Sequence, residues 1–569
     1  MKRLIPILIA LAIIAAIIYF VFYPEYQERY EYSDERADLM AYFGVADETE
    51  VAIILQDTKI NEKARYWDDT YYFDLDTVYT YLNSRFYVDE RENLLLYSFP
   101  DDTVRVSIGG RTINSKSGQA TRSYIIARYE ASALTEGDTL YIAVDFLKDF
   151  CNFSYEAFKD PGRMQVYTEW GSIQTARINR DTAVRYRGGV KSEILTEVEN
   201  GERVTVLEQM ETWAKVKTDD AFIGYVENRR LSSIYSEGQV PVTSFVEPEY
   251  ASQVRGHKIS MGWHYIGGPS GNDSLIEVTQ NTKGLNVISP TWFFLNDDEG
   301  NFLSFASAAY VRQAHELGLE VWGLIENMTH DVDMFELLSA TTKRAQLIEN
   351  LIETALEYEL DGINIDFEDL RPPTGPHFVQ FIRELSIPCR EHGLVLSVDN
   401  YVPYSFNEFY GRSEQGLFAD YVVIMGYDEH YGGSDTAGSV ASINFVEHGI
   451  IATAEQVPPE KVINGVPFYT RIWETQGADV SSQAVGMETA QQWVENRGLT
   501  PQWDEETCQY YAEHRDADGV LHQVWLEDAR SLSVKFNVMA ANDIGGVAFW
   551  RLGMETPDVW DEVLLYLGE

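Results

Sequence analysis

The stretch LDGINIDFEDL at Leu360–Leu370 decides the fold of the longest part of this chain. In an extended conformation Asn364, Asp366 and Glu368 share one face of a strand, because side chains alternate along a strand, and the apolar residues between them share the other. A helical pattern over 345–360 precedes the stretch. A helix that feeds a buried strand ending in paired acids is typical of an α/β barrel, whose active site lies at the C-terminal ends of its strands. We therefore interpret Asp366 and Glu368 as functional side chains rather than as a solvated polar face.

Apolar runs alternate with helix-compatible segments from about Tyr250 to the end of the chain. Parallel strands covered by helices are nearly continuously apolar, and these runs have that character. Eight such runs in a stretch of this length match a (β/α)8 TIM barrel. We therefore expect an α/β fold with this barrel over residues 250–569. The eight expected strands are Ile259–Tyr265, Val287–Phe294, Val321–Ile325, Gly362–Phe367, Val395–Asn400, Tyr421–Tyr427, Val462–Tyr469 and Gly546–Trp550.

The chain is strongly acidic. It has 90 acidic and 44 basic residues among 569, which gives a formal net charge of −46. Nucleic-acid binding needs a positive surface, so this balance argues against a nucleic-acid partner. It is compatible with a neutral, polyhydroxylated ligand, and equally with acidity that serves solubility alone. The length predicts about three or four domains, and a hydrophobic fraction of 45% excludes a mostly disordered chain.

The amino terminus carries an apolar run. Leu4–Tyr23 contains no charged residue and follows Lys2 and Arg3. The run is about as long as a bilayer-spanning helix needs to be, and bulky residues stand where cleavage of a secretory signal would require small ones. We therefore expect an uncleaved transmembrane anchor at residues 1–24, and a single-pass protein of the cell membrane with an extracytoplasmic catalytic domain at the bacterial surface. A cleaved signal peptide is the alternative.

Cysteine usage argues against metal sites and disulfide frameworks. Cys151, Cys389 and Cys508 are odd in number and far apart, and no CxxC pair or histidine-rich cluster accompanies them. We expect buried free thiols, no metal site and no cofactor.

Residues 45–170 contain one pattern twice. Tyr71–Tyr79 and Leu140–Leu147 each predict a strand that leads into a short helix, and two further strand-like runs follow each of them. The pattern resembles the copper amine oxidase amino-terminal domain, a stalk-like module of exported bacterial proteins. The resemblance implies an α+β stalk module at 45–170. We expect no copper site there, since no histidine cluster is present.

Residues 173–235 consist of short strand-like runs. Their order, with WAKV at Trp213–Val216 and IGYV at Ile223–Val226, resembles the bacterial Src-homology-three-type (SH3) domain, a small β-barrel. In that family such domains often bind cell-wall peptides. We interpret Trp213 as a core residue of the small barrel rather than as a ligand contact. A linker at 236–249 with glycine and prolines follows.

The LDGINIDFEDL stretch also carries a specific resemblance. Asp361–Glu368 resembles the D-G-x-x-x-D-x-E signature of glycoside hydrolase family 18, the chitinase-like barrels. Within that family the chain is most similar to the spore-germination and cortex-lytic branch, because of Tyr427–His430, Gly438–Ser442 and Val524–Asp528. The other matching segments are Ser289–Trp292, Met425–Asp428, Gly465–Tyr469 and Trp550.

The resemblance implies a role for each site residue. Members of this family use substrate-assisted retaining catalysis, in which the 2-acetamido group of N-acetylglucosamine attacks its own anomeric carbon. Glu368 would then donate the proton and later act as the base, Asp366 would orient the acetamido group, and Tyr427 would hydrogen-bond its carbonyl. The implied catalytic residues are Glu368, Asp366 and Tyr427, and the implied substrate-binding residues are Asn364, Asp428, Trp550, Trp292 and Tyr469.

Asn364 departs from the commonest pattern of the family, which has a further aspartate there. The missing negative charge should ease ionisation of Asp366, and the amide can still donate a hydrogen bond to it. Asp366 in turn disfavours ionisation of Glu368, two residues away on the same face, and so keeps it protonated near neutral pH. Further aromatic residues near strand ends either line sugar subsites or fill the core: Trp322, Tyr401, Tyr404 and Trp473.

These inferences lead to one main hypothesis and two alternatives. We expect a cell-surface glycosidase that hydrolyses β-1,4 bonds after N-acetylglucosamine, with peptidoglycan or a related wall glycan as its substrate. The expected partners are that glycan and the membrane, with no nucleic acid and no obligate protein partner. A non-catalytic, lectin-like glycan-binding protein is the first alternative, although such relatives generally lack the acid. A wall-anchored scaffold with a slow barrel is the second.

Overall fold

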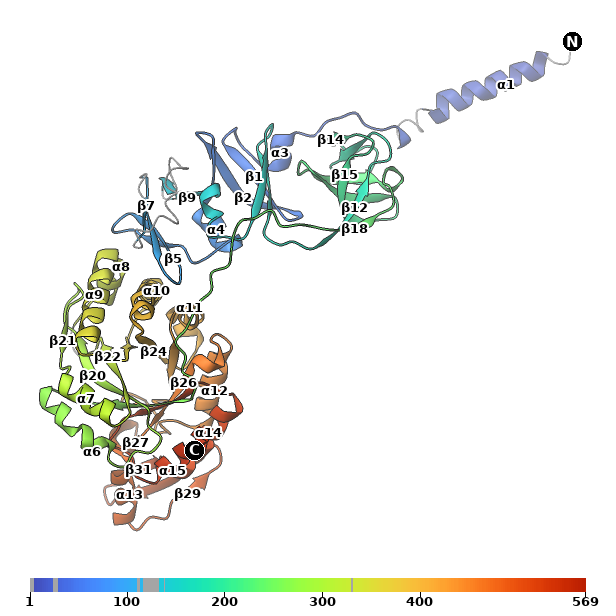
Figure 1. The fold of residues 1–569 in the computed structure, drawn as a ribbon. Helices are drawn as coiled ribbons and strands as arrows, with labels where there is room; N and C mark the ends of the chain where they lie inside the picture. The colour runs from blue at the N-terminus through green and yellow to red at the C-terminus, as the bar shows by residue number, and fades with distance from the viewer. Residues whose placement is uncertain are drawn as a thin grey trace. The chain divides into compact units, whose positions relative to one another are not determined.

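Two compact units make up the chain (Figure 1). The structure, a computed structural model, describes residues 5–23, 29–109, 113–115, 133–137, 139–328 and 331–568. The first unit comprises Met1–Phe86, Val106–Ile113 and Gln119–Glu247, and the second comprises Tyr87–Arg105, Asn114–Gly118 and Pro248–Glu569. The region predicted as a barrel therefore lies in the second unit.

The apolar run at the amino terminus is divided between two helices. The α-helix α1 (Ile5–Ile17) has 13 residues, and the π-helix η1 (Ile18–Phe22) follows it. At about 1.5 Å per residue α1 is roughly 20 Å long, whereas the hydrocarbon core of a bilayer is about 30 Å thick. Within the described part of the chain, no helix combines the length and the apolar character that crossing a membrane requires. The predicted anchor at 1–24, with its single-pass membrane location and membrane partner, is therefore wrong; residues 1–4 and 24 lie outside the described ones.

A mixed sheet in the first unit contains most of the repeated pattern. Its elements, with one preceding helix, are α3 (Leu39–Phe43), β1 (Glu50–Leu55), β2 (Thr58–Trp67), β3 (Thr70–Asp74), α4 (Leu75–Tyr81), β8 (Ala133–Glu136), β9 (Thr139–Ala143), α5 (Val144–Leu147), β10 (Ser154–Phe158) and β11 (Arg163–Tyr167). The strand order is β10-β11-β1-β2-β3-β9-β8, with β1 parallel to β11. Asp74 begins α4 by accepting a hydrogen bond from the backbone N–H of Thr77. The predicted passage from strand to short helix is present twice, as β3 to α4 and as β9 to α5.

A second sheet forms the small β-domain of the first unit. Its elements are β12 (Ser172–Arg177), β13 (Thr182–Arg185), β14 (Ile194–Val198), β15 (Arg203–Gln209), β16 (Trp213–Thr218), β17 (Ile223–Glu227), η2 (Asn228–Arg230) and β18 (Tyr235–Gly238). The strand order is β14-β13-β17-β16-β15-β12-β18. Ala214, Val216 and Val226 belong to its buried core, and Trp213 is partly buried beside Gly188.

Eight parallel strands close into a barrel in the second unit. They are β19 (Ile259–His264), β20 (Val287–Leu295), β22 (Glu320–Glu326), β23 (Gly362–Asp366), β24 (Val395–Tyr401), β25 (Tyr421–Met425), β26 (Val462–Pro467) and β32 (Gly546–Trp550). Each pairs in parallel with its neighbour, and β32 pairs with β19, which closes the ring. The predicted TIM barrel is therefore confirmed. A short strand, β21 (Phe302–Ser304), extends β20 in antiparallel fashion.

Apolar residues fill both sides of the barrel wall. Trp322 and Val423 belong to a buried cluster made of strand residues from around the ring, whereas Ile363 and Ile365 pack with residues of the surrounding helices. This division follows from the alternation of side chains along a strand. The helices are α6 (Leu275–Thr279), α7 (Ala308–Glu316), α8 (Met334–Ser339), α9 (Thr341–Glu357), α10 (Gly375–His392), α11 (Arg412–Phe418), α12 (Ile443–Ala454), α14 (Ala529–Ala541) and α15 (Val559–Leu567), with 3-10 turns η3 (Pro269–Ser274), η4 (Pro372–Thr374), η5 (Ser405–Tyr410) and η6 (Pro459–Lys461).

An antiparallel sheet is inserted between β26 and β32. It consists of β27 (Tyr469–Gln476), β28 (Asp479–Gly486), β29 (Gln502–Asp504), β30 (Gln509–Arg515) and β31 (Leu521–Leu526), and α13 (Met487–Asn496) packs on it. The strand order is β28-β27-β31-β30-β29. Because β27 begins directly after β26, the insertion starts at the carboxyl end of the barrel strands.

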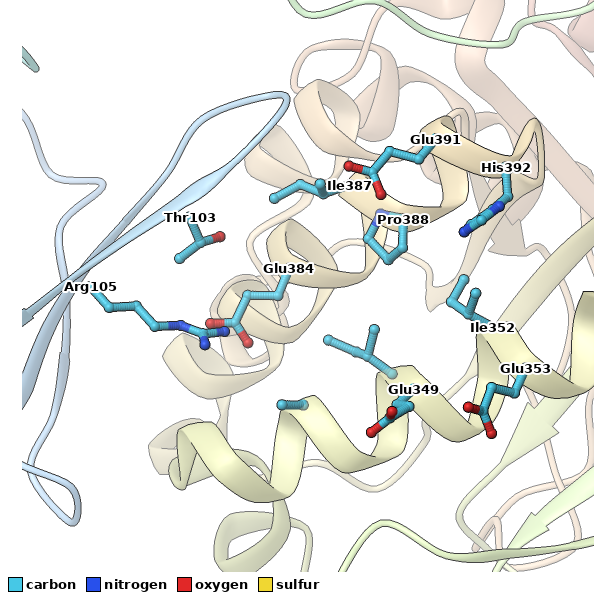
Figure 2. Close-up of a pocket in the computed structure, with 12 residues that line it drawn as sticks. Thr103, Arg105, Glu349, Ile352, Glu353, Glu384, Ile387, Pro388, Glu391 and His392 are labelled. Carbon is cyan, nitrogen blue, oxygen red and sulfur yellow. The ribbon is translucent and has the colours of Figure 1, made fainter. Parts of the chain in front are cut away.

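A small sheet also belongs largely to the second unit. Its strands are β4 (Tyr87–Asp89), β5 (Leu94–Ser98), β6 (Thr103–Ser107) and β7 (Ile113–Ser115). Figure 2 shows Thr103 and Arg105 of β6 facing α10, with Arg105 directed toward Glu384. The pocket between β6, α9 and α10 has a volume of about 360 Å³ and lies away from the predicted site residues.

Candidate active site

The strand β23 divides its residues between the barrel interior and the outer layer. Asn364 and Asp366 are buried on the inner face, whereas Ile363 and Ile365 join the apolar layer beneath the helices. Glu368 follows just past the end of the strand and is partly buried. The alternation predicted from the sequence therefore directs the acidic side chains to the carboxyl end of the barrel, where α/β barrels place their active sites.

Asp361, the first residue of the signature, has a structural role. Its Oδ2 atom accepts hydrogen bonds from the backbone N–H of Val321 and from the ring Nε2 of His315, both at 2.8 Å. Asp361 precedes β23, so it lies at the amino end of the barrel strand, away from Glu368. It joins the starts of two neighbouring strands.

Asn364 is fully buried beneath the site. Its Oδ1 atom accepts hydrogen bonds from the indole N–H of Trp263 (3.0 Å) and the hydroxyl of Ser289 (3.1 Å). Its Nδ2 atom donates to Oδ1 of Asp399 (2.8 Å). The amide therefore does not donate to Asp366, because it is turned toward Asp399. With no exposed surface, Asn364 positions its neighbours and forms none of the cleft surface.

Asp366 has a buried carboxylate oxygen without a hydrogen-bond partner among the described residues. The side chain is only 6% exposed, and its Oδ1 atom has no hydrogen-bond partner among the described residues. Burial raises the pKa of Asp366 well above its ordinary value, and the nearby carboxyl groups of Glu368, Asp399 and Glu326 raise it further. A buried oxygen without a partner is costly, so a ligand that donates a hydrogen bond here would be stabilised.

Glu368 is held by its backbone and by one phenol. Its backbone N–H donates to Oδ1 of Asn327 (2.9 Å), and Nδ2 of Asn327 donates back to the Glu368 carbonyl (2.8 Å). Burial raises the pKa of the Glu368 carboxyl group; a hydrogen bond from the Tyr401 hydroxyl opposes this, and the charges of Asp428 and Glu326 reinforce it. The balance favours a carboxylic acid that keeps its proton to higher pH than usual, as a general acid requires.

Two tyrosines and an aspartate form the neighbouring wall. The ring of Tyr427 meets the rings of Trp263 and Tyr469 edge-on, at centroid distances of 6.4 and 6.3 Å. Burial raises the pKa of Tyr427 well above its ordinary value, and Asp366 raises it further, so the phenol keeps its proton. The Tyr469 hydroxyl donates to Oδ1 of Asp428 at 2.5 Å. The structure therefore brings Tyr427 close to Asp366, and Tyr469 fixes Asp428.

Trp550 ends β32 at the mouth of the barrel. Its ring packs edge-on against Trp263 at 5.8 Å, and the side chain is partly exposed. Trp263 is itself 1% exposed, so it supports Trp550 from inside the barrel. The exposed part of Trp550 is compatible with the predicted apolar floor of a sugar site.

Trp292 lies apart from these residues. It is fully buried, its indole N–H donates to Oδ1 of Asn272 (2.8 Å), and its ring packs against Tyr310 of α7. Ser289 of the same strand faces inward to Asn364, and Trp292, three residues later, faces the outer layer. No face of its indole is open to a sugar in this structure.

The other aromatic residues near strand ends separate into two groups. Trp322 and Trp473 are fully buried, the first stacked on Tyr421 inside the barrel. Tyr401 contacts Glu368, and Tyr404 is 41% exposed. Only position in the folded chain distinguishes core aromatics from cleft aromatics here.

An open cleft with a volume of about 920 Å³ begins at Glu368. The loops that follow β22 and β23 line it, and among its residues are Asn327, Asp333, Phe335 and Arg371. Clefts of this size with a few convergent polar groups are the usual form of ligand sites.

Sequence reasoning missed three polar residues of the site: Glu326, Asn327 and Asp399. Glu326 and Asp399 are 6% and 3% exposed, and their charges act on Asp366. Each of the three lies at or just past the end of a predicted strand, so the rule that barrel sites lie at the carboxyl ends of strands was the available signal.

Two family models match the chain. Residues 286–555 match "Glycosyl hydrolases family 18", and residues 181–232 match "Bacterial SH3 domain". Among curated proteins, the cortical fragment-lytic enzyme of Bacillus anthracis is 28% identical over 246 residues, which cover 42% of this chain and 56% of the relative. The enzyme of the same name from Bacillus subtilis is 28% identical over 233 residues, which cover 39% and 54%. The chain spans about half the length of the curated relatives it matches.

Solved structures share the barrel. A chitinase from Chromobacterium violaceum aligns with a TM-score of 0.50 and 23% identity, covering 55% of this chain and 99% of that one. The spore cortex-lytic enzyme SleL of Bacillus cereus aligns with a TM-score of 0.50 and 23% identity, covering 57% and 76%. This likeness establishes the fold, and the family matches confirm the predicted glycoside hydrolase and SH3 domains. The stalk module at 45–170 stays a prediction.

Proposed function

We propose that this chain, whose residues 286–555 match the family 18 glycosyl hydrolases, hydrolyses β-1,4 bonds after N-acetylglucosamine in peptidoglycan or a related wall glycan. The observation that carries the proposal is the pair Asp366 and Glu368 at the carboxyl end of β23, both with raised carboxyl pKa values. A carboxyl group whose pKa is raised keeps its proton to higher pH than usual and can therefore protonate a leaving oxygen. The cortical fragment-lytic relatives and the SH3 match support a bacterial wall glycan as the substrate class.

The reaction we propose is substrate-assisted and retaining. The acetamido carbonyl oxygen attacks the anomeric carbon, the bond to the leaving sugar breaks, and Glu368 gives its proton to the leaving oxygen. The resulting oxazolinium ion is then opened by water. Glu368, now a carboxylate, takes a proton from that water as it attacks the anomeric carbon, so the carboxylic acid and the acetamido group are both restored.

Asp366 and Tyr427 suit the two ends of the acetamido group. The unpartnered Oδ1 atom of Asp366 can accept a hydrogen bond from the acetamido N–H. The Tyr427 phenol, which stays protonated, can donate a hydrogen bond to the acetamido carbonyl oxygen and so orient it for attack on the anomeric carbon. Trp550 would support the apolar face of the sugar ring at the point of cleavage.

The test compares wild type with Glu368→Gln on purified peptidoglycan and on N-acetylglucosamine oligomers. Mass spectrometry should find products with reducing N-acetylglucosamine ends, and Glu368→Gln should lower the rate at least about 100-fold, because it removes the general acid and base. Glu349→Gln, an exposed change on α9, is the control and should leave the rate unchanged. A wild type that releases no fragment from any substrate would favour the lectin-like alternative instead.

A further inference from the structure

We infer that the β4–β5 hairpin, residues 87–98, completes the glycan cleft by holding Phe335 as a sugar-binding platform beyond the point of cleavage. This inference rests on the proposed function. It assigns a positioning role to the hairpin, which lies far outside the family 18 match in sequence.

The hairpin is attached to the start of α9. Ala340 precedes α9 and has no side chain that can cap it. Asp89, which is fully buried, accepts hydrogen bonds from the backbone N–H and the hydroxyl of Thr341, both at 2.6 Å. Glu92 accepts the corresponding pair from Thr342, at 2.7 and 2.5 Å. Two acidic side chains of the hairpin therefore provide the cap that α9 lacks.

A buried ion pair fixes the hairpin further. Arg344 is fully buried and pairs with Glu384 of α10 through two hydrogen bonds of 2.9 and 3.2 Å. It also donates to the Tyr87 hydroxyl at 3.1 Å, and that hydroxyl meets Nδ1 of His377 at 2.7 Å. A buried guanidinium requires a partner for each donor, so Tyr87 of the hairpin is part of the barrel's own network.

Arg91 extends this attachment to the first turn of α8. Its two terminal nitrogens each lie 2.5 Å from a carboxylate oxygen of Glu336. The guanidinium also lies over the ring of Phe335, 5.6 Å from its centroid. A bidentate fork fixes both distance and direction, and a cation over a ring is attracted to its face. Arg91 therefore positions Phe335.

Phe335 borders the same cleft as Glu368. It is 38% exposed, and the ring of His377 supports it edge-on at 5.0 Å. A rigid aromatic ring with an exposed surface can pack against the apolar face of a pyranose, as aromatic residues do in ligand sites. Phe335 follows β22, and none of the contacts described around Asp366 involves it among the residues that the structure describes, so the geometry points to a sugar unit more distant than the one that is cleaved.

The test measures how binding depends on the length of the glycan. Calorimetry on the Glu368→Gln protein, with the trimer and the hexamer of N-acetylglucosamine, reports binding without turnover. Phe335→Ala should weaken hexamer binding about tenfold, the scale of one lost aromatic contact, and trimer binding less than about twofold. Arg91→Ala should show the same length dependence, and the double variant should lose no more than Phe335→Ala alone, because Arg91 acts through Phe335.

Controls separate this inference from a loss of folding and from the proposed function. Lys283→Ala breaks the exposed ion pair with Asp561 and should change neither affinity. Phe335→Tyr should keep hexamer binding, and Phe335→Leu repeats the test if Phe335→Ala unfolds. Equal weakening for both lengths, or an unchanged hexamer affinity, overturns the inference. A further outcome is that the wild type hydrolyses no glycan while the variants still show binding that depends on glycan length. That result would overturn the proposed function but would support the Phe335 site.

Discussion

Like charges and burial set the protonation of single residues in this site. The pKa of Asp366 is raised by three nearby carboxyl groups, those of Glu368, Asp399 and Glu326. Each negative charge makes the next harder to form, and burial removes the water that would stabilise it. The pKa values of Asp366, Glu368 and Asp399 are therefore raised, and Glu368 can serve as the acid.

Glu326→Gln tests this account through the pH dependence of turnover. Glu326 raises the pKa of Glu368, so removal of its charge should lower that pKa. Activity requires the protonated acid, and the alkaline limb of the kcat/KM profile should therefore move to lower pH. The profile is measured on an N-acetylglucosamine oligomer, with Glu349→Gln as the control. A limb that moves to higher pH would contradict the assignment.

Asn364→Asp should change both the pH dependence of turnover and the stability of the folded protein. The new carboxyl group would face Oδ1 of Asp399 at the 2.8 Å that now separates Nδ2 from it, so one proton would remain between the two groups. The folded state would then bind a proton that the unfolded chain releases above about pH 4. Because the folded state binds more protons, its free energy of unfolding falls as pH rises.

The variant should therefore lose more thermal stability at pH 8 than at pH 5, relative to wild type at each pH. Differential scanning calorimetry at the two pH values measures the loss. An equal decrease at both would show that no proton is retained between residues 364 and 399.

Helix starts show which elements depend on distant parts of the chain. Asp333, Ser442 and Asp528 immediately precede α8, α12 and α14 and cap them from within the local sequence. Ala340 before α9 cannot do so, and Asp89 takes that position. One helix of the barrel wall is thus completed by a strand from outside the barrel sequence.

Asp89→Ala should destabilise the barrel by about 1–3 kcal/mol, because it removes a cap and leaves the buried donors of Thr341 without an acceptor. The thermal midpoint of the second unit should fall accordingly. Asp273→Ala, an exposed change in η3, is the matched control. Identical midpoints for the two variants would mean that water replaces the Asp89 carboxylate at no cost.

The second unit of the molecule is discontinuous in sequence, since Tyr87–Arg105 belongs to it together with Pro248–Glu569. A fragment that begins at residue 248 would lack the hairpin residues that bind the barrel. Asp89 binds Thr341, Arg91 binds Glu336, and the Tyr87 hydroxyl accepts one hydrogen bond from Arg344. We expect the fragment to unfold at a lower temperature than the corresponding transition of the full chain. Circular dichroism during heating measures this, and a fragment as stable as the intact unit would show that the hairpin is dispensable.

The fold was largely predictable because its signals are local. Each barrel strand is an apolar run with turn residues at its ends, and each was expected where the structure has it. The amino-terminal run shows the limit of that reasoning. Its length and composition predicted one membrane-spanning helix, but the backbone changes from α to π geometry at Ile18, and α1 ends after 13 residues.

The sequence by itself determined the barrel and the positions of Asp366 and Glu368, because the alternation in Leu360–Leu370 directs side chains without help from elsewhere. Only the tertiary structure decided which polar groups meet. Asn364 pairs with Asp399, 35 positions later, and Asp89 with Thr341, 252 positions later. Such contacts depend on how separate elements pack, and hydrogen bonds form only between groups that packing brings within about 3 Å. No local pattern contains that information.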